Sequence, residues 1–222
     1  MLAGSVGELD NTYILYGSDH GYNLGQFGVP SHKTQVYDHV TRVPFMVAGP
    51  GIAPGSRVDQ VSSYVDITPT LLDLAGYEAS PGDGYSTQMD GRSFARFLSG
   101  DRNVGDWKTA ALIEYQSIHA PFRPWPSKNG LPGIPVRYTD AGNNSFVGLR
   151  ILNATHDLLY AEFSDVTDWD FKSPYFYELY DHHNDPFQKK NIFSQASPEL
   201  KAQLHQQLLR ARTCKGSGCS LR

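Results

Sequence analysis

The sequence predicts an α/β layer followed by a small α+β part, and the order of its local patterns carries that prediction. Residues 1–100 alternate short apolar, strand-like runs with helix signals, which is typical of an α/β layer. Residues 107–222 hold three strand-like runs joined by hairpin-length connections, followed by one amphipathic helix. We therefore expect two domains, 1–106 and 107–222, the second built from an antiparallel sheet and a C-terminal helix.

In the first part, glycines and prolines mark where the strands end. Residues 13–16 form a short β-prone run, and a glycine-rich loop follows it as far as Pro30. Residues 32–39 favour a short helix, and residues 43–51 favour a second buried strand that stops at Gly-Pro-Gly. Strands that alternate with helices in this way indicate a layer with parallel strands.

The clearest helix signals of the first part lie in residues 65–77. Asp66 or Thr68 can cap the start of this helix, and Gly76 is placed to end it. A further short helix is expected over residues 91–98. Both helices belong to the α/β layer that the alternating pattern predicts.

The character of the chain changes after Gly100. Residues 119–135 are rich in proline and are expected to form an irregular surface loop. Strands are expected at 145–152, 156–163 and 175–181, and Ser197 followed by Pro198 opens an amphipathic helix over 197–213. An antiparallel sheet packed against one helix is the simplest assembly of these elements.

Composition and charge exclude two classes of partner. The chain has 222 residues, of which 40% are hydrophobic and 19% charged, as in an ordinary globular protein. Its net charge of −4 comes without a basic stripe, so we expect no nucleic-acid partner. No apolar run approaches the roughly 20 residues of a membrane-spanning helix, so we expect no membrane span.

Two features indicate an oxidising, secretory compartment. Cys214 and Cys219 flank a Gly-Ser loop that suits a small disulfide hairpin, although two free thiols on a tail would give the same spacing. Asn143 and Asn153 each begin an N-glycosylation sequon, a short motif that also arises by chance. Together these residues predict a protein of the secretory pathway.

The N-terminal stretch MLAGSVGELDNTY does not fit a secreted protein that begins at Met1. It lacks the basic start and the apolar core of a signal peptide. Either the protein is cytosolic or the chain begins inside a longer one. The stretch GSVGELDNT, which reads as the end of a helix and a turn, favours the second interpretation.

The stretch ILYGSDHGYNLGQ, residues 14–26, delivers charged groups to the end of a strand. Ligands of open α/β sheets bind at the carboxyl ends of strands, so Asp19 is a candidate ligand for a hard cation. His20 is either a second ligand or a hydrogen-bond donor to whatever the metal holds, and Gly21 leaves room for close approach. The alternative is structural: Asp19 caps the turn and His20 packs against tyrosines.

Lys33 follows the glycine-rich loop, which could fold its ammonium group back toward Asp19 and His20. A compact cation beside a metal forms an anion site that suits phosphate or sulfate. A solvated surface lysine is the ordinary alternative. His32 lies in the same loop, where it either contacts substrate or takes part in loop packing.

The stretch GSDHGYNLGQFGVPSHKTQVYDHVTRVPFMVAGPGI resembles the sulfatase pattern, and DITPTLLDLAG, MDGRSF and LYDHHNDPFQKKNI stand where that family has its counterparts. Within the family, GYNLGQFGVPSHK, ALIEYQ, LLYAEF and the terminal TCKGSGC are similar to those of N-acetylglucosamine-6-sulfatases. The ordered set covers essentially the whole chain. One departure is the proline-rich loop at 119–135, which has no cysteines where that subgroup tends to have many.

The resemblance implies an alkaline-phosphatase-like α/β fold and hydrolysis of sulfate esters of sugars such as those of glycosaminoglycans. Sulfatases use a formylglycine made in a C-x-P-x-R motif and a divalent cation, usually calcium. Asp19 and His20 match a pair that holds this cation, and imidazole is the weaker ligand for calcium. Lys33 matches the catalytic lysine that contacts the sulfate. A lysosomal or extracellular location is implied as well.

The sequence holds only part of the sulfatase machinery. It has no C-x-P-x-R segment, and the family's early Asp-Asp pair is absent. The chain therefore resembles the C-terminal half of a sulfatase: 1–106 would be the last part of the catalytic domain and 107–222 the small C-terminal subdomain. We expect it to need the N-terminal half of the same enzyme and to be inactive alone.

Two other functions remain open at this point. A phosphodiesterase or phosphomutase of the same superfold also uses Asp-His-Gly at a strand tip, with zinc or manganese, and would need further His and Asp ligands. An inactive truncated product would retain the motifs without the reaction.

Overall fold

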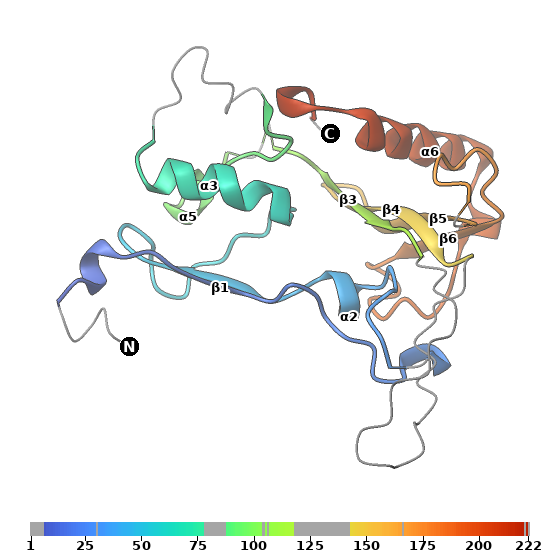
Figure 1. Ribbon diagram of the computed structural model, residues 1–222, viewed down its shortest axis with the longest axis horizontal. Helices are drawn as coiled ribbons and strands as arrows, with labels where there is room; N and C mark the ends of the chain where they lie inside the picture. Colours follow the sequence, from blue (N-terminus) through green and yellow to red (C-terminus); the bar gives the residue numbers. More distant parts are fainter. Residues whose placement is uncertain are drawn as a thin grey trace, which may run out of the picture.

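The structure is a computed structural model that describes residues 7–29, 31–77, 88–103, 105, 107–117, 143–165, 167–219 and 221. Figure 1 shows an extended first part that contains β1, and a second part in which a sheet lies under the long helix α6. The proline-rich loop expected at 119–135 lies outside the described residues. The strands are β1 (Ile14–Gly17), β2 (Phe45–Ala48), β3 (Ala110–Tyr115), β4 (Ser145–Leu152), β5 (Asp157–Ser164) and β6 (Phe176–Asp181). The α-helices are α2 (Asp38–Thr41), α3 (Ile67–Leu74), α5 (Ala95–Leu98) and α6 (Pro198–Thr213), and short 3₁₀-helices lie at Leu9–Asn11, Gln26–Gly28, Tyr64–Asp66, Phe193–Gln195 and Gly216–Gly218.

The two strands of the first part are antiparallel, so the expectation of parallel strands is wrong. Ile14 lies opposite Ala48, and Gly17 lies opposite Phe45. A parallel pair needs a crossover that brings the chain back to the end where the first strand began. Here the glycine-rich loop and α2 turn the chain around at the end of β1, so β2 runs back alongside it.

Strands β1 and β2 are also less buried than their apolar sequences predict. Ile14 is 47% exposed, Tyr16 62% and Met46 58%. The side chains of α3 continue this apolar surface, with Val65 just before the helix and Leu71 within it both exposed. Among the described residues, no layer covers this face, which is why both strands remain open to solvent.

The helix expected over 32–39 is shorter and lies later in the chain. Only Asp38–Thr41 is helical, and the backbone at Tyr37 is extended. Val36 is 1% exposed because this extended segment inserts it into the core of the second part. Burial of an apolar side chain against a sheet has overridden the local preference for helix in residues 32–37.

Helix α3 begins and ends close to the predicted positions. Ser63 and Asp66 form a capping box around the 3₁₀-turn before it, and Gly76 takes a positive φ of 70° at its end. The carboxylate of Asp66 is fully buried and pairs with the Lys108 ammonium group at 2.5 Å. Helix α5 occupies only the second half of the range expected at 91–98, and before it the backbone nitrogen of Arg92 donates to the Asp66 carboxylate at 2.9 Å.

The second part is the expected antiparallel sheet with a C-terminal helix, in the order β3-β4-β5-β6. The three predicted strands match β4, β5 and β6, and α6 begins at Pro198 with the Ser197 hydroxyl accepting from the backbone of Leu200. Strand β3 is an addition, because AALIEY was not singled out as a strand. It pairs with β4 along its whole length, with Ala110 opposite Ile151.

Alternating residues of the sheet pack against two different layers. One face packs on α6, and its buried residues include Val147, Leu149, Ile151, Leu158, Tyr160 and Leu179. The opposite face packs on the segment that carries Val36, and its buried residues include Phe146, Leu159, Ala161 and Tyr180. The sheet is therefore covered on both faces, and the loop from the first part supplies the second layer.

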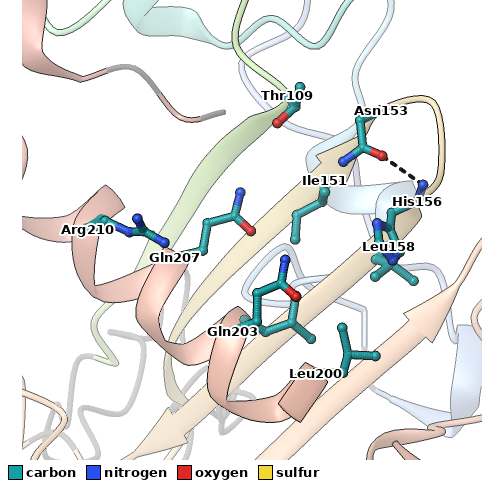
Figure 2. A pocket seen from close by; sticks show the side chains of 10 residues that line it. Thr109, Ile151, Asn153, His156, Leu158, Leu200, Gln203, Gln207 and Arg210 are labelled. Atoms are coloured by element: carbon teal, nitrogen blue, oxygen red, sulfur yellow. Dashed lines mark hydrogen bonds between the residues drawn. The ribbon is translucent and has the colours of Figure 1, made fainter. Parts of the chain in front are cut away.

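Helix α6 lies across one face of the sheet and leaves a groove beside the turn between β4 and β5 (Figure 2). Leu204 and Leu208 are the buried contacts of the helix. The apolar face of α6 thus explains its amphipathic sequence, as predicted.

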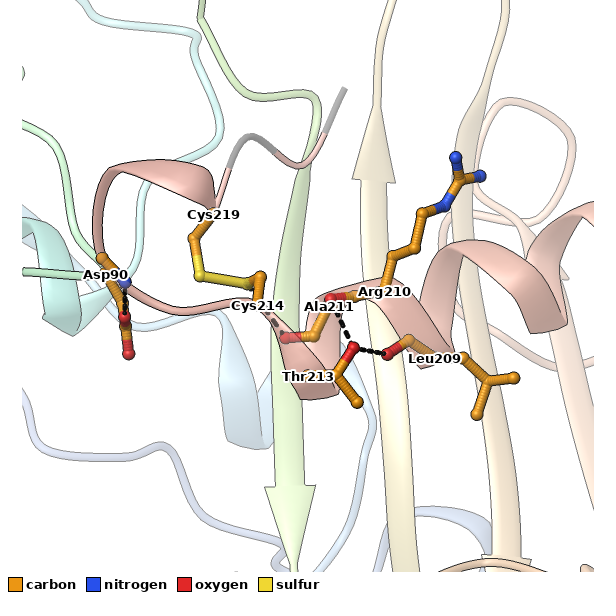
Figure 3. Close-up of a disulfide and its surroundings, with 8 residues drawn as sticks. Asp90, Leu209, Arg210, Ala211, Thr213, Cys214 and Cys219 are labelled. Atoms are coloured by element: carbon orange, nitrogen blue, oxygen red, sulfur yellow. Dashed lines mark hydrogen bonds between the residues drawn. A yellow bond between two sulfur atoms is a disulfide. The ribbon is translucent and has the colours of Figure 1, made fainter.

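The C-terminal tail is closed by a disulfide between Cys214 and Cys219 (Figure 3). Within the loop, the backbone nitrogen of Gly216 donates to Asp90 at 2.6 Å. Beyond the loop, the Leu221 carbonyl accepts from the backbone nitrogens of Thr109 and Ala110 at the start of β3. The tail therefore contacts the polypeptide on both sides of the junction between the two parts.

The first prediction concerns Glu178, a 6% exposed carboxyl that accepts from the Tyr37 hydroxyl at 3.1 Å. Burial raises its pKa from 4.5 to about 7. Since the folded pKa is the higher one, the stabilising contribution is complete below pH 4.5 and is lost as the pH rises through about 7. Glu178→Gln should remove up to about 3 kcal/mol of this pH dependence. Urea unfolding at pH 5 to 8 measures it.

The control for this prediction is Glu8→Gln, because Glu8 is exposed. Its unfolding free energy should follow the pH dependence of the unchanged protein. If Glu178→Gln also followed that dependence, the buried carboxyl would not be protonated near neutral pH.

The second prediction concerns the disulfide. Replacing both Cys214 and Cys219 by Ala should lower the unfolding free energy by about 2 kcal/mol, because the five-residue separation closes a short loop in the unfolded chain. Thermal unfolding of the variant beside the oxidised and the reduced protein measures this. An equal melting temperature for the oxidised protein and the variant would contradict it.

Candidate functional site

The candidate site begins at the end of β1, where the chain packs directly on α2. The backbone nitrogen of Gly21 donates to the Val40 carbonyl at 2.7 Å. A Cβ atom on Gly21 would lie 2.0 Å from the His39 carbonyl oxygen, so no other residue fits here without a shift of the backbone. The glycine of Asp-His-Gly is therefore required by backbone packing, and it fixes the position of the two residues before it.

The glycine-rich loop closes on itself before it reaches Lys33. Asn23 and His32 form a two-way backbone bridge, with N···O distances of 2.7 and 3.2 Å. Inside the loop, Gly25 and Gly28 take positive φ values of 106° and 72°. These turns let the chain return to the end of β1 within a few residues, and the next side chain after the bridge is that of Lys33.

The structure brings Asp19, His20 and Lys33 into contact. The Nζ of Lys33 lies 2.6 Å from Nε2 of His20, and the same Nε2 lies 3.1 Å from Oδ2 of Asp19. The other ring nitrogen, Nδ1, lies 2.6 Å from the Gly21 carbonyl oxygen, which can only accept. The hydrogen is therefore placed on Nδ1, and Nε2 accepts from the lysine.

The carboxylate of Asp19 faces open space. Its side chain is 81% exposed, whereas that of His20 is 31% exposed. Asp19 lies on the border of a groove of about 440 Å³ whose other walls are largely apolar, formed by Leu15, Phe45, Tyr64, Ile67 and Leu71 with Gly17 and Ser18. A carboxylate, an imidazole and an ammonium group thus meet at one end of an apolar surface.

The donor set supplies only part of a cation site. Asp19 offers the hard oxygen donor that calcium or magnesium prefers. His20 fits less well, because its Nε2 is already used as the acceptor for Lys33. Within the described ranges, no group of three or more His, Cys, Asp or Glu side chains is placed to hold a metal ion. A cation bound at Asp19 would need further ligands from another polypeptide segment.

His32 is part of the loop closure described above, and its side chain is half-buried. Its bridge partner, Asn23, was not identified from the sequence as a residue that holds the loop. Asn23 is 1% exposed, donates from Nδ2 to the Val29 carbonyl at 2.9 Å and contacts the His39 ring at 3.1 Å. Burial lowers the pKa of His39. A polar residue between glycines is the only local signal that could have identified Asn23 as the residue that holds the loop.

Helix α2, on which the site rests, is fixed to the second part by partly buried charges, whose side chains are 17–21% exposed. Arg150 on β4 contacts Asp38 at 3.3 Å and Asp157 on β5 at 2.5 Å. His182 is 8% exposed and lies between the same two carboxylates, at 3.7 and 3.5 Å. Burial is the main cause that lowers its pKa. The sheet of the second part thereby positions the helix that supports Gly21.

This chain resembles known sulfatases in sequence and in fold. The family model described as Sulfatase matches residues 3–77. The N-acetylglucosamine-6-sulfatase of Bos taurus is 36% identical over 96% of this chain and 37% of its own length. The extracellular sulfatase SULF-1 homolog of Drosophila melanogaster is 45% identical over 49% of this chain and 9% of its own length. The chain thus spans little more than a third of the length of the first of these relatives, in agreement with the part of a sulfatase expected from the sequence.

One solved structure matches with a TM-score of 0.66 and 26% identity, covering 95% of this chain and 36% of the other. It is described as a complex with its substrate, D-glucosamine-2-N,6-O-disulfate. The sequence likeness runs through both parts of the chain, and the fold likeness does the same. The chain belongs to the sulfatase family and has the fold of its structural neighbours.

Proposed function

We propose that this chain is part of a sulfatase that hydrolyses sulfate esters of sugars, with the end of β1 as its share of the active site. One observation carries the proposal: Asp19, His20 and Lys33 meet at the strand end, with contacts of 2.6 and 3.1 Å through His20. A carboxylate for a cation and an ammonium group for an anion are the two charges that binding of a metal-held sulfate requires.

Each residue has a separate role in this proposal. Asp19 binds a divalent cation, and calcium is the candidate because the donor is a hard oxygen. Lys33 binds the sulfate and stabilises the charge that develops on the leaving oxygen. His20 orients the Lys33 ammonium group through Nε2 and is at most a weak metal ligand. His32 closes the loop behind Lys33 and borders the substrate.

The nucleophile must come from another segment. A formylglycine supplies the attacking oxygen in this family, and the sequence contains no C-x-P-x-R motif in which one could form. Both cysteines are joined in the C-terminal disulfide. The chain alone is therefore proposed to be inactive, and the N-terminal half of the same enzyme is proposed as its partner.

The exposed apolar surface supports such a partner. The groove at Asp19 is lined by residues of β1, β2 and α3, and Tyr16, Met46 and Leu71 of these three elements are each at least 45% exposed. An open apolar face with an unpaired strand edge is an interaction surface or an aggregation risk. We propose that the missing half covers this face and brings the remaining cation ligands and the nucleophile to Asp19.

The substrate class rests on the relatives. One is an N-acetylglucosamine-6-sulfatase, and one solved neighbour holds a sulfated glucosamine. We propose a 6-sulfated amino sugar of a glycosaminoglycan as the substrate. A secretory route to a lysosomal or extracellular site is proposed with it, supported by the disulfide and by a relative named as extracellular. None of the helices in the described part of the chain is long and apolar enough to cross a membrane.

The test is to isolate the native protein from its source, map its peptides and assay it with N-acetylglucosamine-6-sulfate. Peptides upstream of Met1 that include a formylglycine, together with release of sulfate, are expected. A native chain that begins at Met1 and releases no sulfate would overturn the proposal in favour of an inactive product. Hydrolysis of phosphate diesters with two tightly bound zinc ions would favour a phosphodiesterase instead.

The third prediction is that Lys33→Met lowers kcat of the complete enzyme on a sulfated sugar by about 10²- to 10³-fold. The reason is that the substitution removes the positive charge that stabilises the developing oxyanion. Steady-state kinetics measures this. Lys189→Met is the control, since Lys189 lies over the Phe187 ring, remote in sequence from the site. Equal kcat values for the two variants would contradict the role of Lys33.

The fourth prediction is that Asp19→Asn weakens calcium binding by the complete enzyme at least about tenfold, or roughly 1.4 kcal/mol, because an ionised oxygen donor is removed. Isothermal titration with calcium chloride measures the Kd. Asp59→Asn removes an exposed carboxylate that pairs with Arg57 and should leave the Kd unchanged. An unaltered Kd for Asp19→Asn would exclude this residue as a ligand.

A further inference from the structure

The groove between α6 and the turn that joins β4 to β5 is not part of the site described above. Figure 2 shows it from close by, with side chains converging from the helix, the turn and the start of β3. Its volume is about 110 Å³, and its floor is apolar and buried, formed by Ile151, Leu158 and Leu204. A groove of this size accommodates one face of a small ring with an apolar substituent.

The border of the groove is polar and uncharged except at one end. Gln203 and Gln207 on α6 reach over it, and Arg210 stands at the far end of the same helix face (Figure 2). Thr109 and His156 border the other side. Glutamine side chains both donate and accept hydrogen bonds, so this border matches a ligand rich in hydroxyl and amide groups.

One lining residue is Asn153, the first residue of the Asn-Ala-Thr sequon. Its Oδ1 accepts from the backbone nitrogens of Thr155 and His156 and from the Thr155 hydroxyl, each at 2.9 Å. These bonds fix the amide plane. In the described part of the chain no group accepts from Nδ2, and Figure 2 shows this nitrogen on the side of Asn153 that faces the groove.

We propose that Asn153 carries an N-linked glycan and that the groove holds its first N-acetylglucosamine. In the modification, a bond forms between Nδ2 and C1 of the sugar, the bond from C1 to the pyrophosphate of a lipid-linked oligosaccharide breaks, and the amide releases one proton. The acetyl methyl group of the sugar packs on Leu204 and Ile151. Its amide and hydroxyl groups bind Gln203 and Gln207.

The other sequon does not offer such a place. Asn143 is exposed, and its carbonyl oxygen accepts from the Tyr175 hydroxyl. The third residue of that sequon, Ser145, is fully buried, and its hydroxyl accepts from the backbone of Ser117. Asn143 therefore serves as the internal control. The inference rests on the secretory route proposed above and does not depend on sulfatase activity.

The first experiment measures occupancy. The full chain is produced in a eukaryotic secretory host, and its glycopeptides are mapped by mass spectrometry. A glycan at Asn153 is expected in the unchanged chain and in Thr155→Ser, and it should be absent in Thr155→Ala, which keeps the asparagine. An unmodified Asn153 in the unchanged secreted chain would overturn the proposal.

The second experiment tests the groove. An endoglycosidase that leaves one N-acetylglucosamine should keep the Tm of the fully glycosylated chain. The same chain from a bacterial host, which lacks the sugar, should melt about 2–4 °C lower if the contacts contribute about 1 kcal/mol. Thr155→Ala produced in both hosts should show no difference in Tm between the hosts. This control separates the effect of the sugar on Tm from the effect of losing the Thr155 hydroxyl.

Matched variants on α6 locate the contact. Gln207→Ala should reduce the Tm difference between the one-sugar and sugar-free chains, whereas Gln206→Ala should not, because Gln206 is exposed and does not line the groove. A nuclear Overhauser contact between the acetyl methyl group and the Leu204 methyl groups is also expected. A glycan at Asn153 that shows no Tm difference, or one insensitive to Gln207, would overturn its placement in the groove.

Discussion

The contact between Gly21 and the His39 carbonyl is the constraint on which the candidate site depends. The space for a Cβ atom is already taken, at 2.0 Å, and the Gly21 nitrogen is used by Val40. The end of β1 is thereby fixed against α2 by backbone atoms, which cannot change rotamer to relieve a clash. Because Asp19 and His20 directly precede this point, their positions follow from a packing requirement and not from their own side-chain bonds.

The helix that receives Gly21 is held from the opposite side by the second part. Asp38 opens α2, and its carboxylate is shared by Arg150 and by His182. Charges shielded from water are costly unless they are paired, and here one guanidinium group contacts two partly buried carboxylates, while burial lowers the pKa of the histidine. The sheet of the second part contributes no residue to the contact between Asp19, His20 and Lys33, yet it determines where that contact lies because it positions α2. The two parts form one structural unit as far as the site is concerned.

The sequence predicts the elements whose environment is decided locally. Near-continuous apolar runs in β4 and β5 match a sheet covered on both faces, and Ser197 with Pro198 fixes the start of α6. Prediction from the sequence fails where a contact between residues far apart in the chain determines the local structure. Val36 draws residues 32–37 out of the expected helix, and no local pattern shows which way β2 runs beside β1. For the candidate site, charge and position predict that Asp19, His20 and Lys33 lie close together, as they do, whereas Asn23 acts through burial inside a loop and gives almost no signal in the sequence.

Strands β1 and β2 show why the sequence overestimates burial in this chain. Their composition is that of strands inside a layered sheet, yet Ile14, Tyr16 and Met46 are each close to half exposed or more. An apolar surface of this kind is typical of an interaction site, and the segment that covers it can be a different stretch of polypeptide. The same face ends at Asp19, whose carboxylate is exposed, and the described residues place no group of three or more His, Cys, Asp or Glu side chains there to hold a cation. Among the described residues, apolar strands without a covering layer thus lie beside an exposed carboxylate, and a single complementary segment placed on this face would cover both.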